Sequence, residues 1–149
     1  MSDTKIRPPR FNHVAMSVPS TLLEPDGRSE LTAFYADVFG WQELPTETVD
    51  GQKLVFGVHT VEQFVFLIAD DPPMTCPRLD HYGLSVETEA ELDAVLAKAK
   101  AWQARDDRVD IVDKKTDDHG MLAITSIYVR YLLPMMVEIQ WWDWKGNRA

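Results

Sequence analysis

The residues whose types could do chemistry are two histidines and one glutamate that lie far apart in the chain. Glu138 interrupts an otherwise apolar run over residues 135–142, and this run predicts a buried strand. An ionised carboxylate is costly to bury without a partner. Glu138 therefore needs an arginine, a hydrogen-bond network or a metal ion beside it, and its own strand leaves these three open.

His13 and His81 occupy matching places in two similar segments. His13 lies in FNHVAMSV, residues 11–18, and His81 lies in LDHYGLSV, residues 79–86. Both segments predict a short strand. Two histidines and one carboxylate with open positions form the facial arrangement that holds non-haem Fe(II) and also suits Mn(II) or Zn(II). We therefore expect His13, His81 and Glu138 to converge within one chain, each about 2.0–2.2 Å from a single ion.

The elements that must position these residues are predicted twice in the same order. The first half gives a strand, a helix and three more strands, over residues 11–18, 29–39, 41–48, 53–58 and 63–69. The second half repeats this order over residues 80–86, 89–102, 108–114, 121–129 and 135–142. Such internal duplication predicts one domain, residues 1–149, with a first βαβββ module at about 11–70 and a second at about 80–142.

Composition narrows the classes of partner. The chain has 149 residues, a net charge of −9 and one cysteine, which rules out an internal disulfide. An acidic protein does not suit nucleic acid or an anionic membrane, because both attract basic surfaces. The sequence has no apolar run of transmembrane length, and its first residues lack a hydrophobic signal core. We therefore expect a cytoplasmic protein that binds a small-molecule substrate.

These residues and the repeat resemble the vicinal oxygen chelate superfamily, which includes glyoxalase I, methylmalonyl-CoA epimerase, extradiol dioxygenases and bleomycin resistance proteins. The resemblance covers residues 11–142. It implies an α+β fold in which two tandem βαβββ modules form a curled mixed sheet around a cupped cavity. It also implies metal ligation by His13, His81 and Glu138, and a homodimer. The order of the three ligands suits a site within one chain.

The resemblance also implies catalytic groups. Extradiol dioxygenases have a C-terminal pattern of a histidine, a hydrophobe–tyrosine pair and the ligand glutamate, and this chain offers His119, Tyr128 and Glu138 at compatible spacing. Tyr128 and His119 would then hydrogen-bond the bound oxygens. Phe66 stands where family members carry a fourth ligand or, in ring-cleaving members, the acid/base histidine. His59 is the first candidate to substitute for that missing base.

The implied function is a metal-dependent enzyme that acts on a small organic substrate with vicinal oxygens, closest to an extradiol dioxygenase-like site. Fe(II) is the favoured cofactor, and Mn(II), Zn(II) or Ni(II) are alternatives. Two other hypotheses stay open. One is a lyase or isomerase of the glyoxalase or epimerase type, and the other is a metal-free binding protein of the resistance type.

Overall fold

The computed structural model describes residues 7–145, and their elements follow the predicted order twice. Module one contains β1 (His13–Val18), α1 (Pro25–Phe39), β2 (Gln42–Glu43), β3 (Lys53–Gly57) and β4 (Phe64–Ala69), with short 3-10 helices at Ser20–Leu22 and Pro45–Glu47. Module two contains β5 (His81–Val86), α2 (Glu89–Gln103), β6 (Val109–Asp118), β7 (Leu122–Tyr131) and β8 (Met136–Trp144). The predicted pair of βαβββ modules is confirmed.

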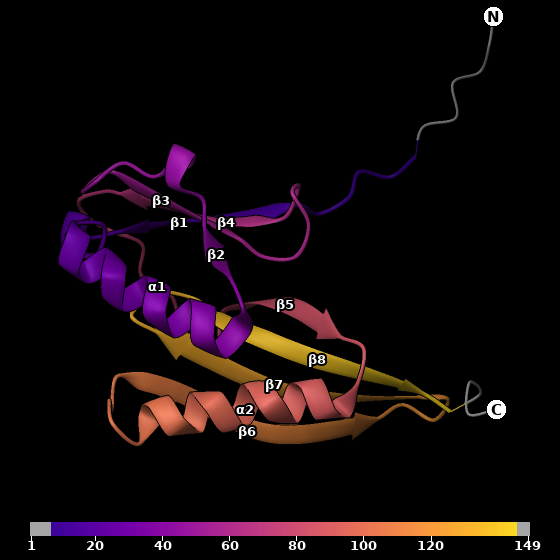
Figure 1. Ribbon diagram of the computed structural model, residues 1–149. Helices are drawn as coiled ribbons and strands as arrows, with labels where there is room; N and C mark the ends of the chain where they lie inside the picture. The colour runs from indigo at the N-terminus through magenta and orange to yellow at the C-terminus, as the bar shows by residue number, and fades with distance from the viewer. Residues whose placement is uncertain (1–6, 146–149) are drawn as a thin grey trace, which may run out of the picture.

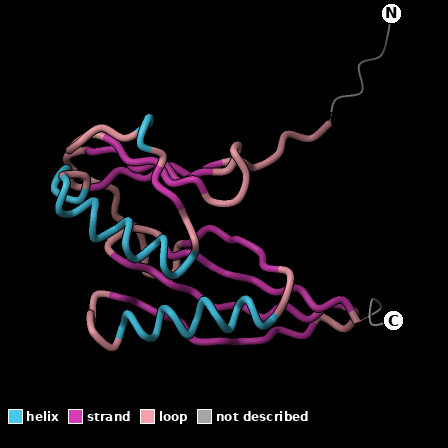
Figure 2. The backbone as a smooth tube through the Cα atoms, viewed as in Figure 1, coloured by secondary structure: helices cyan, strands magenta, loops and turns pink. Residues whose placement is uncertain are grey.

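Each module forms its own four-stranded mixed sheet, as Figures 1 and 2 show. The strand orders are β1-β4-β3-β2 and β5-β8-β7-β6, so the first and last strands of a module lie side by side. These neighbours, β1 with β4 and β5 with β8, are parallel, and the other pairs are antiparallel. The two sheets stay open, which agrees with the predicted α+β fold of curled mixed sheets.

The ends of the two helices follow from a few local residues. Thr88 and Glu91 form a capping box at the start of α2, in which each side chain accepts a hydrogen bond from the other residue's backbone N–H. Gly40 ends α1 in the left-handed conformation at φ 73°. The first helix begins four residues before the predicted range of 29–39, at Pro25, whose fixed φ and missing N–H suit the first turn.

The strands of module one are shorter than predicted, whereas β6, β7 and β8 of module two are longer. The strand predicted over 41–48 is reduced to β2, because Pro45 begins a 3-10 helix directly after it. Asp50 and Gly51 form a turn before β3, with Gly51 at φ 67° and a bridge between Val49 and Lys53. In module two β8 continues to Trp144, so it carries the face of Glu138 beyond the predicted end.

The two modules meet through their helices. The rings of Phe34 on α1 lie 4.6 Å from Tyr131 and 5.4 Å from Trp102, measured between centroids. The Tyr35 hydroxyl donates to the backbone carbonyl of Tyr131 at 3.0 Å. Lys98 on α2 donates to the carbonyl of Asp37 on α1 at 2.8 Å. In Figure 1, α1 accordingly runs between the two sheets.

This arrangement leaves one face of the second sheet without a helix. On β7 the buried residues are Thr125, Ile127, Val129 and Tyr131, and the residues between them are only partly buried. Side chains alternate across a strand, so α2 covers the first set and the second set lies opposite. We call this opposite surface the open face of module two; it consists of Leu122, Ile124, Ser126 and Tyr128 on β7, and Glu138, Gln140, Trp142 and Trp144 on β8. Among the described residues, no helix is long and apolar enough to cross a membrane.

Candidate metal centre

His81 and Glu138 meet at one end of the open face. The strands β5 and β8 run parallel with Gly83 opposite Glu138, so His81 lies two residues before Gly83 on the same face. The His81 Nε2 atom is 3.3 Å from Glu138 Oε2. A Cβ at Gly83 would lie 3.5 Å from that same carboxylate oxygen. The absence of a side chain at Gly83 therefore leaves space beside the carboxylate.

The tautomer of His81 decides what this contact means. Its Nδ1 lies 2.7 Å from the Leu79 carbonyl oxygen, which can only accept, so Nδ1 carries the proton. In the neutral ring, Nε2 then has a lone pair directed toward the carboxylate of Glu138. Two lone-pair atoms do not attract each other without a proton or a cation between them. The pair therefore forms either an imidazolium–carboxylate ion pair or two arms of a metal site.

Tyr128 covers the same carboxylate. It pairs with Glu138 across β7 and β8, and its ring packs edge-on against His81 with centroids 5.0 Å apart. Burial and the hydrogen bond to Glu138 raise the pKa of Tyr128 to about 12. Tyr128 is therefore a phenol at neutral pH and a hydrogen-bond donor. The predicted neighbourhood of Tyr128 and Glu138 is present.

His13 occupies the equivalent place in module one but lies away from the other two candidate ligands. Its ring stacks on Phe64 with centroids 4.6 Å apart, and its Nδ1 lies 2.6 Å from the Asn12 side-chain oxygen. If that oxygen accepts the Nδ1 proton, the Nε2 atom keeps its lone pair. His13 is exposed at the beginning of β1. His13 could therefore bind a metal ion through Nε2, but neither His81 nor Glu138 is grouped with it.

The structure does not bring His13 together with His81 and Glu138 within one chain, so the three-ligand assignment stays a prediction. Within residues 7–145, no three His, Cys, Asp or Glu side chains are grouped so that they could hold a metal ion. A cavity of about 430 Å3 between the modules has His13 on one side and the stretch from Tyr82 to Glu87 on the other. The residues that line this cavity do not include His81 or Glu138. The packing of helix against helix sets how the two modules sit, and the repeated order of elements does not predict that packing.

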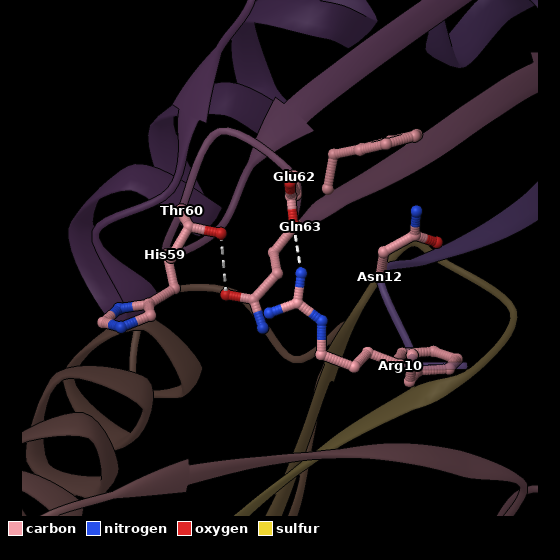
Figure 3. A pocket seen from close by; sticks show the side chains of 8 residues that line it. Arg10, Asn12, His59, Thr60, Glu62 and Gln63 are labelled. Atoms are coloured by element: carbon pink, nitrogen blue, oxygen red, sulfur yellow. Dashed lines mark hydrogen bonds and ion pairs between the residues drawn. The ribbon is translucent and has the colours of Figure 1, made fainter. Parts of the chain in front are cut away.

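His59 lies on the same side of the molecule as His13. It belongs to the turn between β3 and β4 and lines the 430 Å3 cavity together with His13. Figure 3 shows the adjoining hollow of about 610 Å3, where Arg10 pairs with Glu62 at 3.1 Å and the His59 ring is directed away from this pair. His59 is thus near His13 and has no contact with His81 or Glu138 among those described.

His119 lies at the far end of the second sheet. It is in the turn between β6 and β7, where its backbone N–H donates to the Leu122 carbonyl at 2.8 Å. Tyr128 lies six positions after Leu122 on β7, which is roughly 20 Å along a strand. The structure therefore does not bring His119 to the His81–Glu138 pair. Its catalytic role stays a prediction that this geometry does not favour.

Phe66 is the module-one counterpart of Glu138. In module one Phe66 pairs with Ala15, two residues after His13; in module two Glu138 pairs with Gly83, two residues after His81. The register thus places a half-buried phenyl ring where the second module has its carboxylate. Module one can offer a single ligand, His13, and module two can offer two.

Sequence reasoning missed the residues that orient the histidines. The Leu79 carbonyl sets the tautomer of His81, and a backbone atom leaves no signal in a sequence. Asn12 contacts the His13 ring, and Phe64 stacks on it. The only available signals were that Asn12 is adjacent to His13 and that Phe64 begins the strand expected to pair with it.

The donor set of module two fits a divalent metal ion. Two donors, each about 2.1 Å from one ion, lie roughly 3.0–3.4 Å apart at right or tetrahedral angles. The observed 3.3 Å between His81 Nε2 and Glu138 Oε2 falls in that range. The ring orientation set by Leu79 and the hydrogen bond from Tyr128 are the outer contacts that such ligands commonly have. The pair needs at least one more ligand.

Comparison with solved structures identifies the fold. Lactoylglutathione lyase from Agrobacterium tumefaciens matches with a TM-score of 0.61 and 19% identity, over 89% of this chain and 93% of that one. The chain has the vicinal oxygen chelate fold. The fosfomycin resistance protein FosX from Listeria monocytogenes, in complex with Mn(II) and sulfate, matches this fold with a TM-score of 0.62 and 16% identity, over 89% of both chains.

Other matches carry no activity in their descriptions. An integron cassette protein from the mobile metagenome of the Halifax Harbour sewage outfall has a TM-score of 0.57 and 13% identity, over 89% of this chain and 97% of that one. The sequence matches no family model, and it matches no curated protein. At these identities the vicinal oxygen chelate fold is shared, while the reaction is a separate question.

Proposed function

We propose that this chain is a metal-dependent enzyme of the vicinal oxygen chelate fold that acts on a small organic substrate with two adjacent oxygens. The observation that carries the proposal is the His81–Glu138 pair, with its 3.3 Å contact, its set tautomer and the Tyr128 hydroxyl beside it. Solved structures with this fold include a lactoylglutathione lyase and an Mn(II) complex of a fosfomycin resistance protein.

The third ligand in this proposal is His13 of a second copy of the chain. His13 is an exposed residue, and the open face of module two lacks a covering element from its own chain. In a twofold dimer, module one of each copy would approach module two of the other, so two equivalent sites would form. Fe(II) is favoured by the two-histidine, one-carboxylate set, and Mn(II), Zn(II) or Ni(II) are alternatives.

The protein's own groups would bind and orient the substrate. A divalent ion held there supplies Lewis-acid polarisation of the chelated oxygens, and iron would add redox chemistry with dioxygen. Tyr128 would donate a hydrogen bond to Glu138 or to a substrate oxygen, because its raised pKa keeps it protonated. Phe66 cannot transfer a proton. A reaction of the extradiol dioxygenase type would therefore need His59 or another group as its base.

One observation favours a second candidate function. The 430 Å3 cavity between the modules is lined by Phe39, Trp41 and Val95 and has the size of a small-molecule site. A metal-free binding protein of the resistance type would use such a cavity. Metal content after purification separates the two functions, since the binding protein would contain no stoichiometric metal.

A complementation experiment tests the shared metal site. The variants His13→Ala and Glu138→Ala are prepared separately, and each is expected to lose Mn(II) binding at equilibrium. After the two are unfolded and refolded together, half of the dimers contain one chain of each kind. Each such dimer has one intact site of two, so the mixture should recover about one quarter of the wild-type binding sites.

The outcomes separate the alternatives. Recovery near one quarter supports a site shared between copies, whereas binding by either variant alone contradicts the ligand assignment. No recovery from a mixture that does form mixed dimers contradicts sharing. His59→Ala serves as the matched control, because His59 is an exposed histidine in the turn after β3, and its loss should leave Mn(II) binding unchanged.

A further inference from the structure

Asp110 on β6 accepts hydrogen bonds from two arginines. Arg78 lies in the connection between β4 and β5, and its Nε and Nη2 atoms donate to the two carboxylate oxygens at 2.9 and 2.6 Å. Arg130 lies opposite Asp110 on β7, and its Nη2 atom donates at 2.9 Å. A bidentate pair of guanidinium and carboxylate fixes the geometry of both partners. We call these three residues the Asp110 clamp.

The clamp is a lasting contact of the fold and not an open anion site. Asp110 occupies the paired donors of Arg78 that a planar anion would use, and its side chain is 23% exposed. The hydrogen bond from Arg78 lowers the pKa of Asp110, so the carboxylate stays ionised at neutral pH. The segments that the clamp connects therefore show its role.

Arg78 ties down the turn that leads into β5. Residues 77–80 form a β-turn, in which the last N–H donates to the first carbonyl at 3.0 Å. Of the two central side chains, Leu79 is 56% exposed, whereas Arg78 is bound to the sheet through the clamp. The Leu79 carbonyl accepts the Nδ1 proton of His81 at 2.7 Å. The position of that carbonyl, and with it the tautomer of His81, therefore depends on the clamp.

The clamp also reaches the turn that leads into β8. Arg130 donates through Nη1 to the Pro134 carbonyl at 3.1 Å, and the Cys76 Sγ atom lies 3.1 Å from the same oxygen. Pro134 comes two residues before the start of β8, the strand that carries Glu138. The clamp thus connects the segments that directly precede both strands with a proposed ligand.

We infer that Asp110 is a positioning residue for the His81–Glu138 pair. It acts through Arg78 and the Leu79 carbonyl, which keeps the proton on Nδ1 of the histidine and leaves the Nε2 lone pair for a metal ion. This inference rests on the proposed function and adds the group that orients one of its ligands. The role needs no contact with solvent or substrate, so it persists when a second copy covers the open face of module two.

Nitrogen NMR of the metal-free protein tests this link at alkaline pH, where a neutral imidazole shows which of its nitrogens carries the proton. The wild type should show His81 protonated on Nδ1. Asp110→Asn and Arg78→Ala should each shift the proton toward Nε2, from which Glu138 can accept it. Asp113→Asn is the matched control on β6, because it removes an ion pair with α2 and should leave the tautomer unchanged.

Mn(II) affinity distinguishes positioning from a simple effect of charge. Asp110→Asn removes a negative charge and Arg78→Ala removes a positive one, so a through-space effect would weaken binding in the first and strengthen it in the second. Loss of ligand orientation instead weakens both, by about 10-fold. Arg78→Lys keeps the charge without the bidentate fork, and it should also weaken binding. Asp113→Asn should stay within about 2-fold of the wild type.

The outcomes separate this inference from the proposed function. If the wild type binds no Mn(II), the tautomer change still supports the clamp as the group that orients His81, and the metal site alone fails. An unchanged tautomer in folded Arg78→Ala, or tighter Mn(II) binding by that variant, would overturn the inference. Arg78 is half exposed, so this variant tests the link even if Asp110→Asn does not fold.

Discussion

At the scale of single residues, Glu138 has two roles that a substitution can separate. It is 7% exposed and contacts His81, so its shape fills a buried position in the fold, while its charge would bind a metal ion. Glu138→Gln keeps the shape and removes the charge. We expect loss of at least about 100-fold in Mn(II) affinity, with a metal-free melting temperature close to that of the wild type.

Thermal melts with and without Mn(II) check this expectation. The wild type should gain melting temperature on adding metal, and Glu138→Gln should not. An equal gain in both proteins would exclude Glu138 as a ligand. Asp143→Asn, on the same strand but the opposite face, is the matched control and should keep the metal-dependent gain.

Tyr128 gives a pH prediction with a definite sign. Burial and the hydrogen bond to Glu138 raise its pKa to about 12, from 10 in the unfolded chain. The folded state therefore favours the protonated phenol, and the stability linked to it is complete below pH 10 and is lost as the pH rises from 10 toward 12. The ultraviolet difference spectrum between wild type and Tyr128→Phe should show tyrosinate only near pH 12. Tyrosinate at pH 10 would contradict the contact with Glu138.

At the scale of elements, a network around Tyr131 joins α1 to the end of α2. The Tyr131 hydroxyl lies 2.8 Å from Glu30 and 2.7 Å from Asp106, and Arg108 donates to it at 2.9 Å. The hydrogen bond from Tyr131 lowers the pKa of Glu30, and Arg108 lowers the pKa of Asp106. Because both carboxyl pKa values are lower in the folded state, the ionised carboxylates stabilise the fold above about pH 4. This stabilisation is lost as the pH falls.

Tyr131→Phe tests this network. Because the network is partly exposed, we expect a loss of about 1 kcal/mol at pH 7, measured by urea unfolding. The loss should shrink below pH 4, where the carboxyl groups begin to take up protons. A loss that is independent of pH would mean that ring packing, and not the hydroxyl, is what Tyr131 contributes. Thr125→Val, at another buried hydroxyl of β7, controls for a generic loss of polarity.

Local signals predicted the elements better than their lengths. The capping box of α2 and the glycine end of α1 depend on a few neighbouring residues, and both are present. The strand predicted over 41–48 failed at Pro45, because one proline ends the ladder whatever its neighbours prefer. The extension of β8 to Trp144 comes from pairing with Leu122, a long-range contact. The length of a strand depends on the strand with which it pairs, and a local sequence pattern does not show that partner strand.

At the scale of the whole molecule, the same distinction explains the half-predicted site. His81 and Glu138 lie on neighbouring parallel strands of one module, so their meeting follows from register alone. His13 belongs to the other sheet, and its place relative to them depends on how Phe34 and Tyr35 pack against Tyr131. The repeat gives the equivalence of the two histidines but not the rotation between the modules. In a dimer, His13 of a second copy of the chain could reach the His81–Glu138 pair.

The asymmetry between the modules supplies the last prediction. Phe66 takes the place in module one that Glu138 takes in module two, next to His13 in the register. A carboxylate at this position would share an ion with His13, which the proposed site already uses. We therefore predict that Phe66→Glu tightens Mn(II) binding by at least about 10-fold, since a further anionic ligand favours a divalent cation. Competition with a chelator of known affinity measures the change.

The control for Phe66→Glu lies on the same strand. Ile68→Glu adds the same charge two residues further along the same face, where Lys53 is the partner on β3. It should leave Mn(II) affinity within about 2-fold of the wild type. An equal gain in both variants would reveal general electrostatic attraction and not ligation. Glyoxalase activity that appeared only in Phe66→Glu would identify the phenyl ring as the change that separates this chain from the proton-transfer chemistry of the fold.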